Sequence, residues 1–184
     1  KDELKDEEID YLIKNPNTDL FKLFFSKKCI LFEGISEEML LRAYLDSVEE
    51  LSDIELISFH KGYTKIIEIW KKVNDKTKNK LGIIRDYDEE DKAKKNHEKY
   101  NNDKTICVRT TSEKTLEPEI VYTGDNYEIL KKKYGDTLGW KNLSKEELQR
   151  AWRDAKASDM LTICKDIENG ELKNLQMPKH IKEV

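Results

Sequence analysis

Short apolar runs alternate with helical patterns along the first 110 residues, and this alternation limits the folds open to the chain. Cys29–Phe32 is an apolar run closed by Glu33 and Gly34, which is typical of a strand buried on both faces. Three further runs predict strands at residues 54–59, 81–84 and 105–109. Strands separated by helical segments indicate a mostly parallel sheet flanked by helices, so the expected fold class is α/β.

Apolar residues at helical spacing fill the segments between these strands. We expect helices at about residues 37–51, 66–73 and 89–100, the first of them capped by Ser36. Beyond residue 110 the pattern is helical alone, which predicts a C-terminal helical appendage. Its helices are expected at about residues 117–122, 127–134 and 144–169, and a capping box of Ser144 and Glu147 opens the last.

The composition is that of a folded domain with a polar surface. Charged residues make up 39% of the 184 residues and hydrophobic residues 37%, but the apolar ones are clustered rather than spread thinly. No run approaches the roughly 20 apolar residues of a membrane-spanning helix, and no signal peptide is recognisable. Cys29, Cys107 and Cys164 are far apart in sequence, which favours reduced thiols in a cytoplasmic protein.

Several kinds of chemistry find no support in the sequence. A Gly-rich loop ending in Gly-Lys-Ser/Thr is absent, which argues against ATP binding within this chain. The three histidines and three cysteines lack zinc-site spacing, and no serine or cysteine stands in a recognisable catalytic context. Tyr87 stands between two aspartates, but a tyrosine at a strand end more often packs on its neighbours than acts as a nucleophile.

Acidic residues follow two of the predicted strands. Glu33 comes directly after the first strand, with Glu37 one helical turn further on, and Asp86 and Asp88 follow the third strand. Ligands bind at the carboxyl ends of parallel strands, so these four side chains can gather at one edge of the sheet. Like charges held together call for a cation, and carboxylate oxygens suit Mg²⁺ or Mn²⁺. The alternative is that they are surface acids, since the chain has 38 Asp and Glu residues.

The residues that carry these acids resemble a known family. Residues 30–34 with the helix after them, and Ile83–Asp88, are similar to a Toprim domain, the catalytic fold shared by topoisomerases, primases and several nucleases. Asp19–Phe21, Ser36–Glu38 and Thr115–Val121 narrow the resemblance to the C-terminal Toprim region of OLD-family nucleases, which include the nuclease subunit of Gabija-type phage defence. The resemblance extends over about residues 16–172.

The resemblance implies a metal-dependent endonuclease or nickase that hydrolyses DNA with two divalent ions. It assigns one ion, Mg²⁺ or Mn²⁺, to Glu33, Asp86 and Asp88, and makes Glu37 and Glu117 candidates for a second. Lys156 is similar to the family's catalytic lysine, although a helical lysine is often only solvated. Glu117 has a plainer alternative role as a helix-capping acid. Lysines are available for phosphate contacts, together with His97, in the stretches 92–99 and 131–133.

The resemblance also predicts an organisation of the chain and its partners. Residues 1–27 are expected to be a helical connector from a preceding domain, 28–172 the Toprim domain with its helical extension, and 173–184 a C-terminal tail or the start of a further helix. The expected partners are DNA, an N-terminal ABC-type ATPase region outside this chain, and further copies of the protein, with no membrane association. The alternatives are a catalytically inactive Toprim-like module that binds nucleic acid or scaffolds an assembly, and a topoisomerase or primase fragment.

Overall fold

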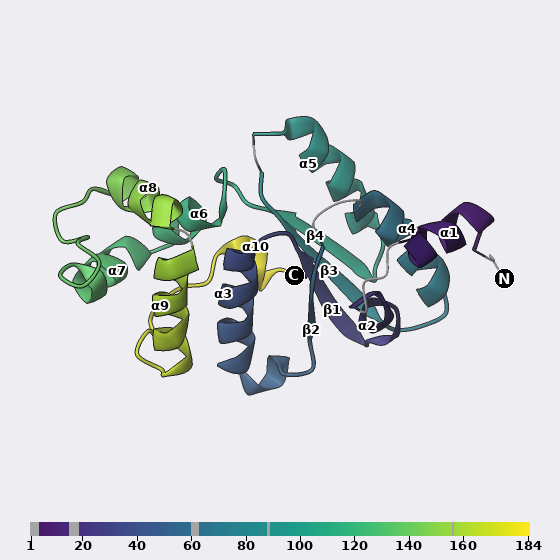
Figure 1. The fold of residues 1–184 in the computed structure, drawn as a ribbon, viewed down its shortest axis with the longest axis horizontal. Coiled ribbons are helices and arrows are strands. Elements are labelled where there is room, and N and C mark those ends of the chain that lie inside the picture. Colours follow the sequence, from purple (N-terminus) through teal and green to yellow (C-terminus); the bar gives the residue numbers. More distant parts are fainter. Residues whose placement is uncertain (1–3, 15–18, 60–62, 88, 156) are drawn as a thin grey trace.

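Four parallel strands form a sheet in the order β2-β1-β3-β4 (Figure 1). The computed structural model describes residues 4–14, 19–59, 63–87, 89–155 and 157–184. The strands are β1 (Lys28–Phe32), β2 (Glu55–Ser58), β3 (Lys80–Arg85) and β4 (Ile106–Thr110). In the register of the central pair, Leu31 of β1 lies beside Ile83 of β3. This sheet and its flanking helices confirm the predicted α/β class and all four predicted strands.

Helices precede, connect and follow the strands. Those before β4 are α1 (Asp6–Lys14), α2 (Asp19–Phe25), α3 (Ile35–Asp46), α4 (Tyr63–Asn74) and α5 (Asp91–Glu98), with 3-10 turns η1 (Glu49–Leu51) and η2 (Lys99–Asn102). Those after β4 are α6 (Leu116–Tyr122), α7 (Asn126–Tyr134), α8 (Lys145–Ala155), α9 (Ala157–Glu168) and α10 (Lys179–Lys182). In the described part of the chain, no helix combines the length and apolarity that a bilayer-spanning segment requires.

Each face of the sheet has its own apolar cluster. Ile30, Phe32 and Ile84 point toward α3 and the C-terminal helices, where they join Trp140 and Trp152. The intervening strand residues, such as Leu31 and Ile83, point toward α2 and α4, where Trp70 is buried. Successive strand residues therefore serve opposite cores, as expected for strands buried on both faces.

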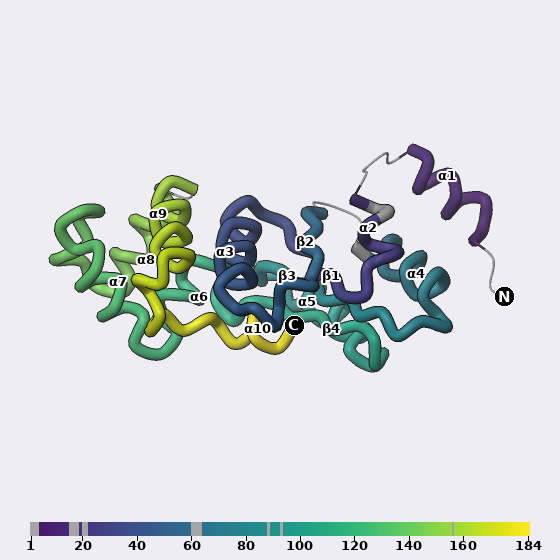
Figure 2. Tube along the Cα trace, turned by 90° about the horizontal axis from the view of Figure 1, so that it is seen from below, coloured from purple at the N-terminus to yellow at the C-terminus, as the bar shows by residue number. Residues whose placement is uncertain are grey.

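The molecule is extended rather than round. Figure 2 shows α1 at one end and α7 at the other, with the sheet between them. Helix α3 packs against both β2 and α9, so it links the sheet to the C-terminal helices. The C-terminal segment returns to the sheet, where α10 contacts β4 and Val184 occupies the space that a side chain on Gly82 would need. Glycine in β3 thus makes room for the end of the chain.

Three predicted helix boundaries were wrong. Helix α3 begins at Ile35 with Gly34 as N-cap, so Ser36 is not the cap but lies buried in the first turn. The helix expected to continue to residue 51 ends at Asp46, where the Ser47 hydroxyl donates to the Tyr44 carbonyl. The helix expected from residue 89 begins at Asp91, because Glu89 has a φ of 62°, which a right-handed helix excludes.

The helix expected over 144–169 corresponds to α8 and α9, which lie on either side of residue 156, a position outside the described residues. The predicted capping box at its start is present: the Ser144 backbone N–H donates to Glu147 at 2.8 Å, and the Glu147 N–H donates back to the Ser144 hydroxyl at 3.3 Å. Buried Trp152 and Met160 stand eight residues apart, which also fits one uninterrupted helix. The apolar spacing therefore continues from α8 into α9.

Candidate metal centre

The carboxyl ends of β1, β3 and β4 lie at the same edge of the sheet, because the strands are parallel and adjacent. Glu33 directly follows β1 and Asp86 directly follows β3. Glu117 lies in the first turn of α6, which follows β4, and it is buried. The segments that follow these three strands thus each bring an acid to this edge. Asp88 and Lys156 lie outside the described residues.

Gly34 and Glu37 form a compact turn between β1 and α3. A Cβ added to Gly34 would collide with Oε2 of Glu37, so the glutamate folds back over the glycine. Burial raises the pKa of the Glu37 carboxyl, and the negative charges of Glu117 and Glu33 raise it further. Hydrogen bonds from the backbone of Glu37 and Gly34 act in the opposite direction. The pKa shift shows that the three glutamates are electrostatic neighbours.

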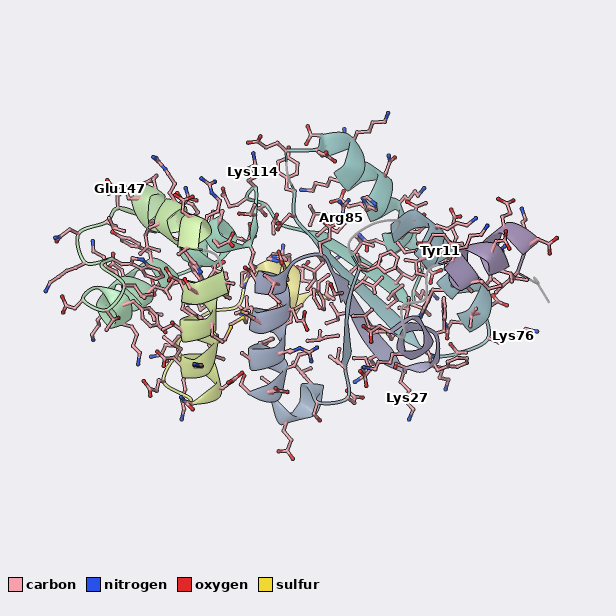
Figure 3. All side chains as sticks on the ribbon, viewed as in Figure 1. Tyr11, Lys27, Lys76, Arg85, Lys114 and Glu147 are labelled. Atoms are coloured by element: carbon pink, nitrogen blue, oxygen red, sulfur yellow. The ribbon has the colours of Figure 1, made fainter. Side chains whose placement is uncertain are left out.

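Glu33 has a positively charged partner that the sequence did not suggest. Arg85 donates from Nε to Oε1 of Glu33 at 2.9 Å, and its Nη1 lies 2.7 Å from Nδ1 of His97 (Figure 3 labels Arg85 at this edge). Since a guanidinium can only donate, Nδ1 of His97 accepts this hydrogen bond. Leu31 pairs with Ile83, so Glu33 and Arg85 are the next residues in phase on the two strands. Only knowledge of this register would have predicted their contact.

The loop after β3 is held by hydrogen bonds around Asp86. The backbone N–H of Tyr87 donates to Oγ1 of Thr111 at 2.9 Å. The Tyr87 hydroxyl donates to Asp91 at 2.6 Å, and this hydrogen bond, with burial, raises the pKa of the tyrosine. Tyr87 is thus hydrogen-bonded to a neighbouring carboxylate, as expected for a strand-end tyrosine that contacts its neighbours.

Glu117 is held by its own helix start. Oε2 of Glu117 accepts from the Thr115 hydroxyl at 2.9 Å, and Thr115 is the N-cap residue of α6. Its side chain is buried beside like charges rather than exposed to solvent, as a simple helix-capping acid at the surface would be. This placement makes Glu117 a credible oxygen donor at the edge of the sheet.

The basic stretches named as phosphate contacts occupy different places. Residues 92–99 lie on and just after α5, and the Lys94 ammonium lies 5.5 Å from the centre of the Tyr87 ring. Residues 131–133 lie on α7, far along the molecule from this edge (Figure 1). Lys133 is paired there with Asp166 and Glu171, and Lys131 donates to the Tyr127 hydroxyl. The α5 stretch is therefore the better placed of the two.

The side chains at this edge are of the chemical type that binds a divalent cation. Glu33, Glu37, Asp86 and Glu117 offer the hard oxygen atoms that Mg²⁺ and Mn²⁺ prefer, and the mutual repulsion at Glu37 is what a cation would relieve. The described residues leave out Asp88. Among them, no group of three acidic, histidine or cysteine side chains is placed to bind one metal ion. Arg85 supplies part of the compensating charge instead.

Sequence reasoning missed Arg85, Thr111, Glu119 and His180, all of which support this edge. Thr111 is buried just after β4, and Glu119 and His180 are buried on α6 and α10. Their roles depend on contacts between segments far apart in the chain, such as the 3.7 Å approach of His180 Nδ1 to Glu119 Oε1. A buried threonine, glutamate and histidine in a polar sequence carry no local pattern that would identify them.

Comparison with known proteins agrees with the sequence resemblance. Residues 24–88 match the family model described as "Overcoming lysogenization defect protein-like, TOPRIM domain". This match includes Glu33, Glu37, Asp86 and Asp88, and ends before Glu117. No curated protein and no solved structure matches the chain. A match to this family suggests a nuclease-type domain related to nucleic acids, and Toprim domains generally bind divalent metals such as Mg²⁺. Residues 24–88 are therefore similar to the OLD-like Toprim domains.

Proposed function

We propose that the chain is a metal-dependent endonuclease or nickase that hydrolyses DNA phosphodiester bonds. The observation that carries the proposal is the meeting of acids from the ends of β1, β3 and β4 at one edge, where Glu117 and Glu33 raise the pKa of Glu37. A solvated surface acid has no reason to be buried beside other acids. The OLD-like Toprim match over the first two of these strand ends supports the same activity.

Each residue has a role in this proposal. Glu33, Asp86 and Asp88 hold one Mg²⁺ or Mn²⁺ ion, and Glu37 and Glu117 hold a second. Bound divalent ions supply charge neutralisation at the phosphate and a more acidic water. Arg85 orients Glu33 through their 2.9 Å ion pair, and Lys156 offsets negative charge that develops on the phosphate. Lysines on α5 attract the DNA backbone to an otherwise acidic chain.

Cleavage of supercoiled plasmid tests the proposal. The chain is incubated with Mg²⁺, with Mn²⁺ and with EDTA, alongside Asp86→Asn and the matched control Asp53→Asn. Asp53 pairs with Lys28 at the amino-terminal end of the sheet, so its loss should leave cleavage unchanged. We expect nicking that requires a divalent ion and falls by about 100-fold or more in Asp86→Asn, since even outer-shell changes at metal sites cost about 10–100-fold. Full cleavage by Asp86→Asn would remove the basis of the proposal.

A nucleic-acid-binding module without turnover is the second candidate, and one observation favours it. Arg85 already compensates Glu33, and the described acids do not by themselves form a three-ligand cage. This candidate predicts that the chain shifts DNA in a gel equally well with Mg²⁺ and with EDTA, and that Asp86→Asn binds as the parent does. Cleavage that depends on the metal would decide against it.

The wider context follows from the family resemblance. We propose that the domain is the nuclease part of a cytoplasmic ATPase–Toprim protein that acts as a homo-oligomer in defence against phage, similar to the Gabija-type nuclease subunit. A plaque assay on cells that express the full-length parent protein tests this, with Asp86→Asn as the inactive variant. Equal protection by both proteins would contradict a defence role for the nuclease.

A further inference from the structure

Thr111 joins the two acidic loops through its backbone and its side chain. Its backbone N–H donates to the Arg85 carbonyl at 3.0 Å, and its hydroxyl accepts from the Tyr87 N–H at 2.9 Å. These two contacts grip the main chain on both sides of Asp86. Thr111 is only 1% exposed, so water does not compete for its hydroxyl. The backbone on both sides of Asp86 is therefore hydrogen-bonded to Thr111, which directly follows the neighbouring strand β4.

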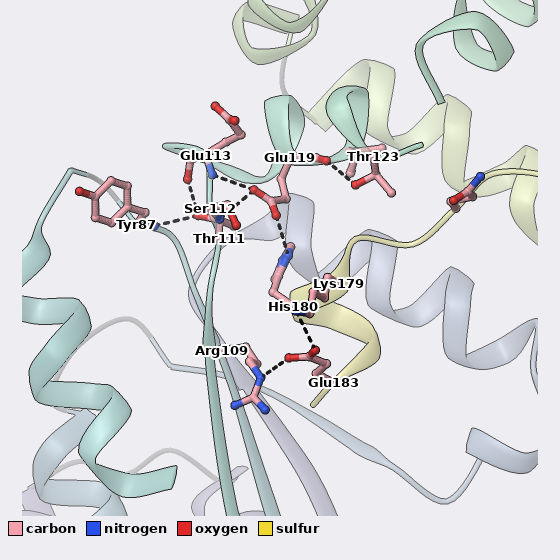
Figure 4. Close-up of polar contacts among 12 residues, drawn as sticks. Tyr87, Arg109, Thr111, Ser112, Glu113, Glu119, Thr123, Lys179, His180 and Glu183 are labelled. Carbon is pink, nitrogen blue, oxygen red and sulfur yellow. Dashed lines mark hydrogen bonds and ion pairs between the residues drawn. The ribbon is translucent and has the colours of Figure 1, made fainter. Parts of the chain in front are cut away.

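The same hydroxyl also fixes the loop that leads to Glu117. Thr111 Oγ1 donates to the carbonyl of Glu113 at 2.6 Å, so it uses its donor on one loop and an acceptor lone pair on the other (Figure 4). Alanine and valine can make neither bond, whereas serine can make both. The loops after β3 and β4 are thus tied to a common atom.

Glu119 holds the second loop from the opposite side. Its Oε2 accepts from the backbone N–H groups of Ser112 at 2.8 Å and Glu113 at 2.7 Å. Figure 4 shows its other oxygen facing the ring of His180 on α10. One oxygen of Glu119 thus holds both N–H groups of this loop.

We propose that Thr111 is a positioning residue of the candidate metal centre, which holds Asp86 and Glu117 in place by tying their loops together, with Glu119 and His180 closing the second loop. The inference depends on the proposed function only where it calls these acids metal ligands. Thr111 itself touches neither metal nor substrate. Thr111 acts on the positions of the two acids, so the first effect of its removal should be greater mobility of the two loops.

Two measurements on one set of variants test the proposal. Hydrogen exchange of the Tyr87 amide, followed by NMR in the absence of metal, measures how firmly the loop after β3 is held. Calorimetric titration with Mn²⁺ measures the affinity of the candidate metal centre for the ion. The variants are Thr111→Ala, Thr111→Val and Thr111→Ser, and the control is Thr77→Ala. Thr77 also accepts a backbone N–H, from Asn79 at 3.2 Å, and donates to Asn74, but at the amino-terminal end of the sheet.

We expect the Tyr87 amide to exchange about 10-fold faster or more in Thr111→Ala and Thr111→Val, because its hydrogen bond is lost. Mn²⁺ affinity should fall by about 10–100-fold in both variants, as is usual for residues that orient metal ligands. Thr111→Ser keeps the hydroxyl and should restore both values to within about 3-fold of the parent. Thr77→Ala should change neither. If Thr111→Val fails to fold, Thr111→Ala against Thr111→Ser decides the question.

Two results would overturn the inference. Unchanged Tyr87 exchange in Thr111→Ala would show that the hydroxyl does not hold the loop. A serine variant as impaired as the alanine variant would assign the effect to the lost methyl group. A parent chain that binds no Mn²⁺ would instead defeat the metal site in the proposed function, and the exchange experiment would still decide whether Thr111 ties the loops.

Discussion

Gly34 has no Cβ, and this lets the Glu37 carboxyl fold back beside Glu33 and Glu117. Its φ of −111° and ψ of 162° suit any residue, so an alanine meets the carboxylate rather than backbone strain. A carboxylate is the flexible end of its side chain and can move aside. We expect Gly34→Ala to cost less than about 1 kcal/mol in unfolding free energy but to displace Glu37.

The displacement has a measurable sign. Burial and two negative neighbours raise the pKa of Glu37, so a carboxyl pushed toward solvent should titrate at a lower pH, closer to its ordinary value. Carbon-13 NMR of the carboxyl follows this titration, and urea unfolding gives the stability. In the Glu37→Ala background, Gly34→Ala should have almost no effect on stability, because nothing remains to collide with. An unchanged Glu37 pKa in Gly34→Ala would contradict the packing described.

Arg85 is the counter-ion of Glu33, so its removal should expose the repulsion among the glutamates. In Arg85→Met we expect a loss of about 1–2 kcal/mol, smaller than for a fully buried pair because Glu33 is partly exposed. If these acids bind a cation, Mg²⁺ should then restore more of the melting temperature in the variant than in the parent. Thermal melts with Mg²⁺ and with EDTA measure both effects.

The matched control for Arg85 is Arg42→Met. Arg42 pairs with Glu38 on the exposed face of α3, where an ion pair one turn apart contributes about 0.5 kcal/mol at most. It should therefore lose little stability and gain nothing from Mg²⁺. A melting temperature of Arg85→Met that matches the Arg42→Met value, with and without Mg²⁺, would remove Arg85 from this account.

At the scale of elements, the sequence predicted strands better than their contacts. Local apolar patterns located β1 to β4, because strands buried on both faces are continuous apolar runs. Helix ends were harder: α3 begins at Ile35 with Gly34 rather than Ser36 as its N-cap, and Gly34 has no side chain that could indicate a cap. Register is not a local property, so Glu33 beside Arg85 could not be foreseen.

Helix α1 is joined to α4 by a buried ion pair that makes a pH-dependent prediction. Both Glu8 oxygens accept from Lys72, at 2.7 and 2.8 Å, and one also accepts from the Lys5 N–H. The hydrogen bond from Lys72 is the main cause of the lowered pKa of Glu8. A depressed folded-state pKa adds stability above the unfolded value, and this is lost as pH falls through the folded pKa.

Glu8→Gln should therefore melt below the parent at pH 7, and the gap should begin to narrow as the pH falls below the ordinary glutamate pKa of about 4.3. The two proteins become alike only once the pH has passed the lowered folded-state pKa of Glu8, where its charge is lost. Glu7→Gln, an exposed acid on the same helix, is the control and should follow the parent throughout. Circular-dichroism melts at pH 7 and pH 3.5 make the comparison, and a constant gap would mean that the Lys72 pair contributes nothing.

For the whole molecule, the sequence was sufficient to locate the acidic edge of the sheet. It was not sufficient to identify the residues that hold this edge in place. The acids Glu33, Glu37 and Asp86 follow predicted strands, so their shared edge was foreseeable from the α/β topology. Glu117 came only from the family resemblance. Glu119 and His180 come together through the return of the C-terminal segment to the sheet, which no local pattern encodes.

The two apolar clusters should unfold together, because the same strands build both. Ile30 and Phe32 serve one cluster while Leu31, between them, serves the other. Neither side can lose its packing without stripping the strands of half their contacts. Trp70 reports on one cluster, and Trp140 with Trp152 on the other. Trp70→Phe retains only the two tryptophans of one cluster, and the double variant Trp140→Phe, Trp152→Phe retains only the tryptophan of the other. In each variant, the fluorescence of the remaining tryptophans can be compared with the backbone signal of the same protein.

In guanidinium titrations, the fluorescence midpoint should coincide with the far-ultraviolet circular-dichroism midpoint within each variant, even though the variants differ in absolute stability. The comparison within one protein removes the cost of the substitution itself, which includes the lost hydrogen bond from Trp70 Nε1 to the Leu23 carbonyl. A Trp70 transition that precedes the backbone transition would mean that α2 and α4 leave the sheet first. The acidic edge, whose residues come from strands shared by both clusters, would then have to keep its geometry from one cluster alone.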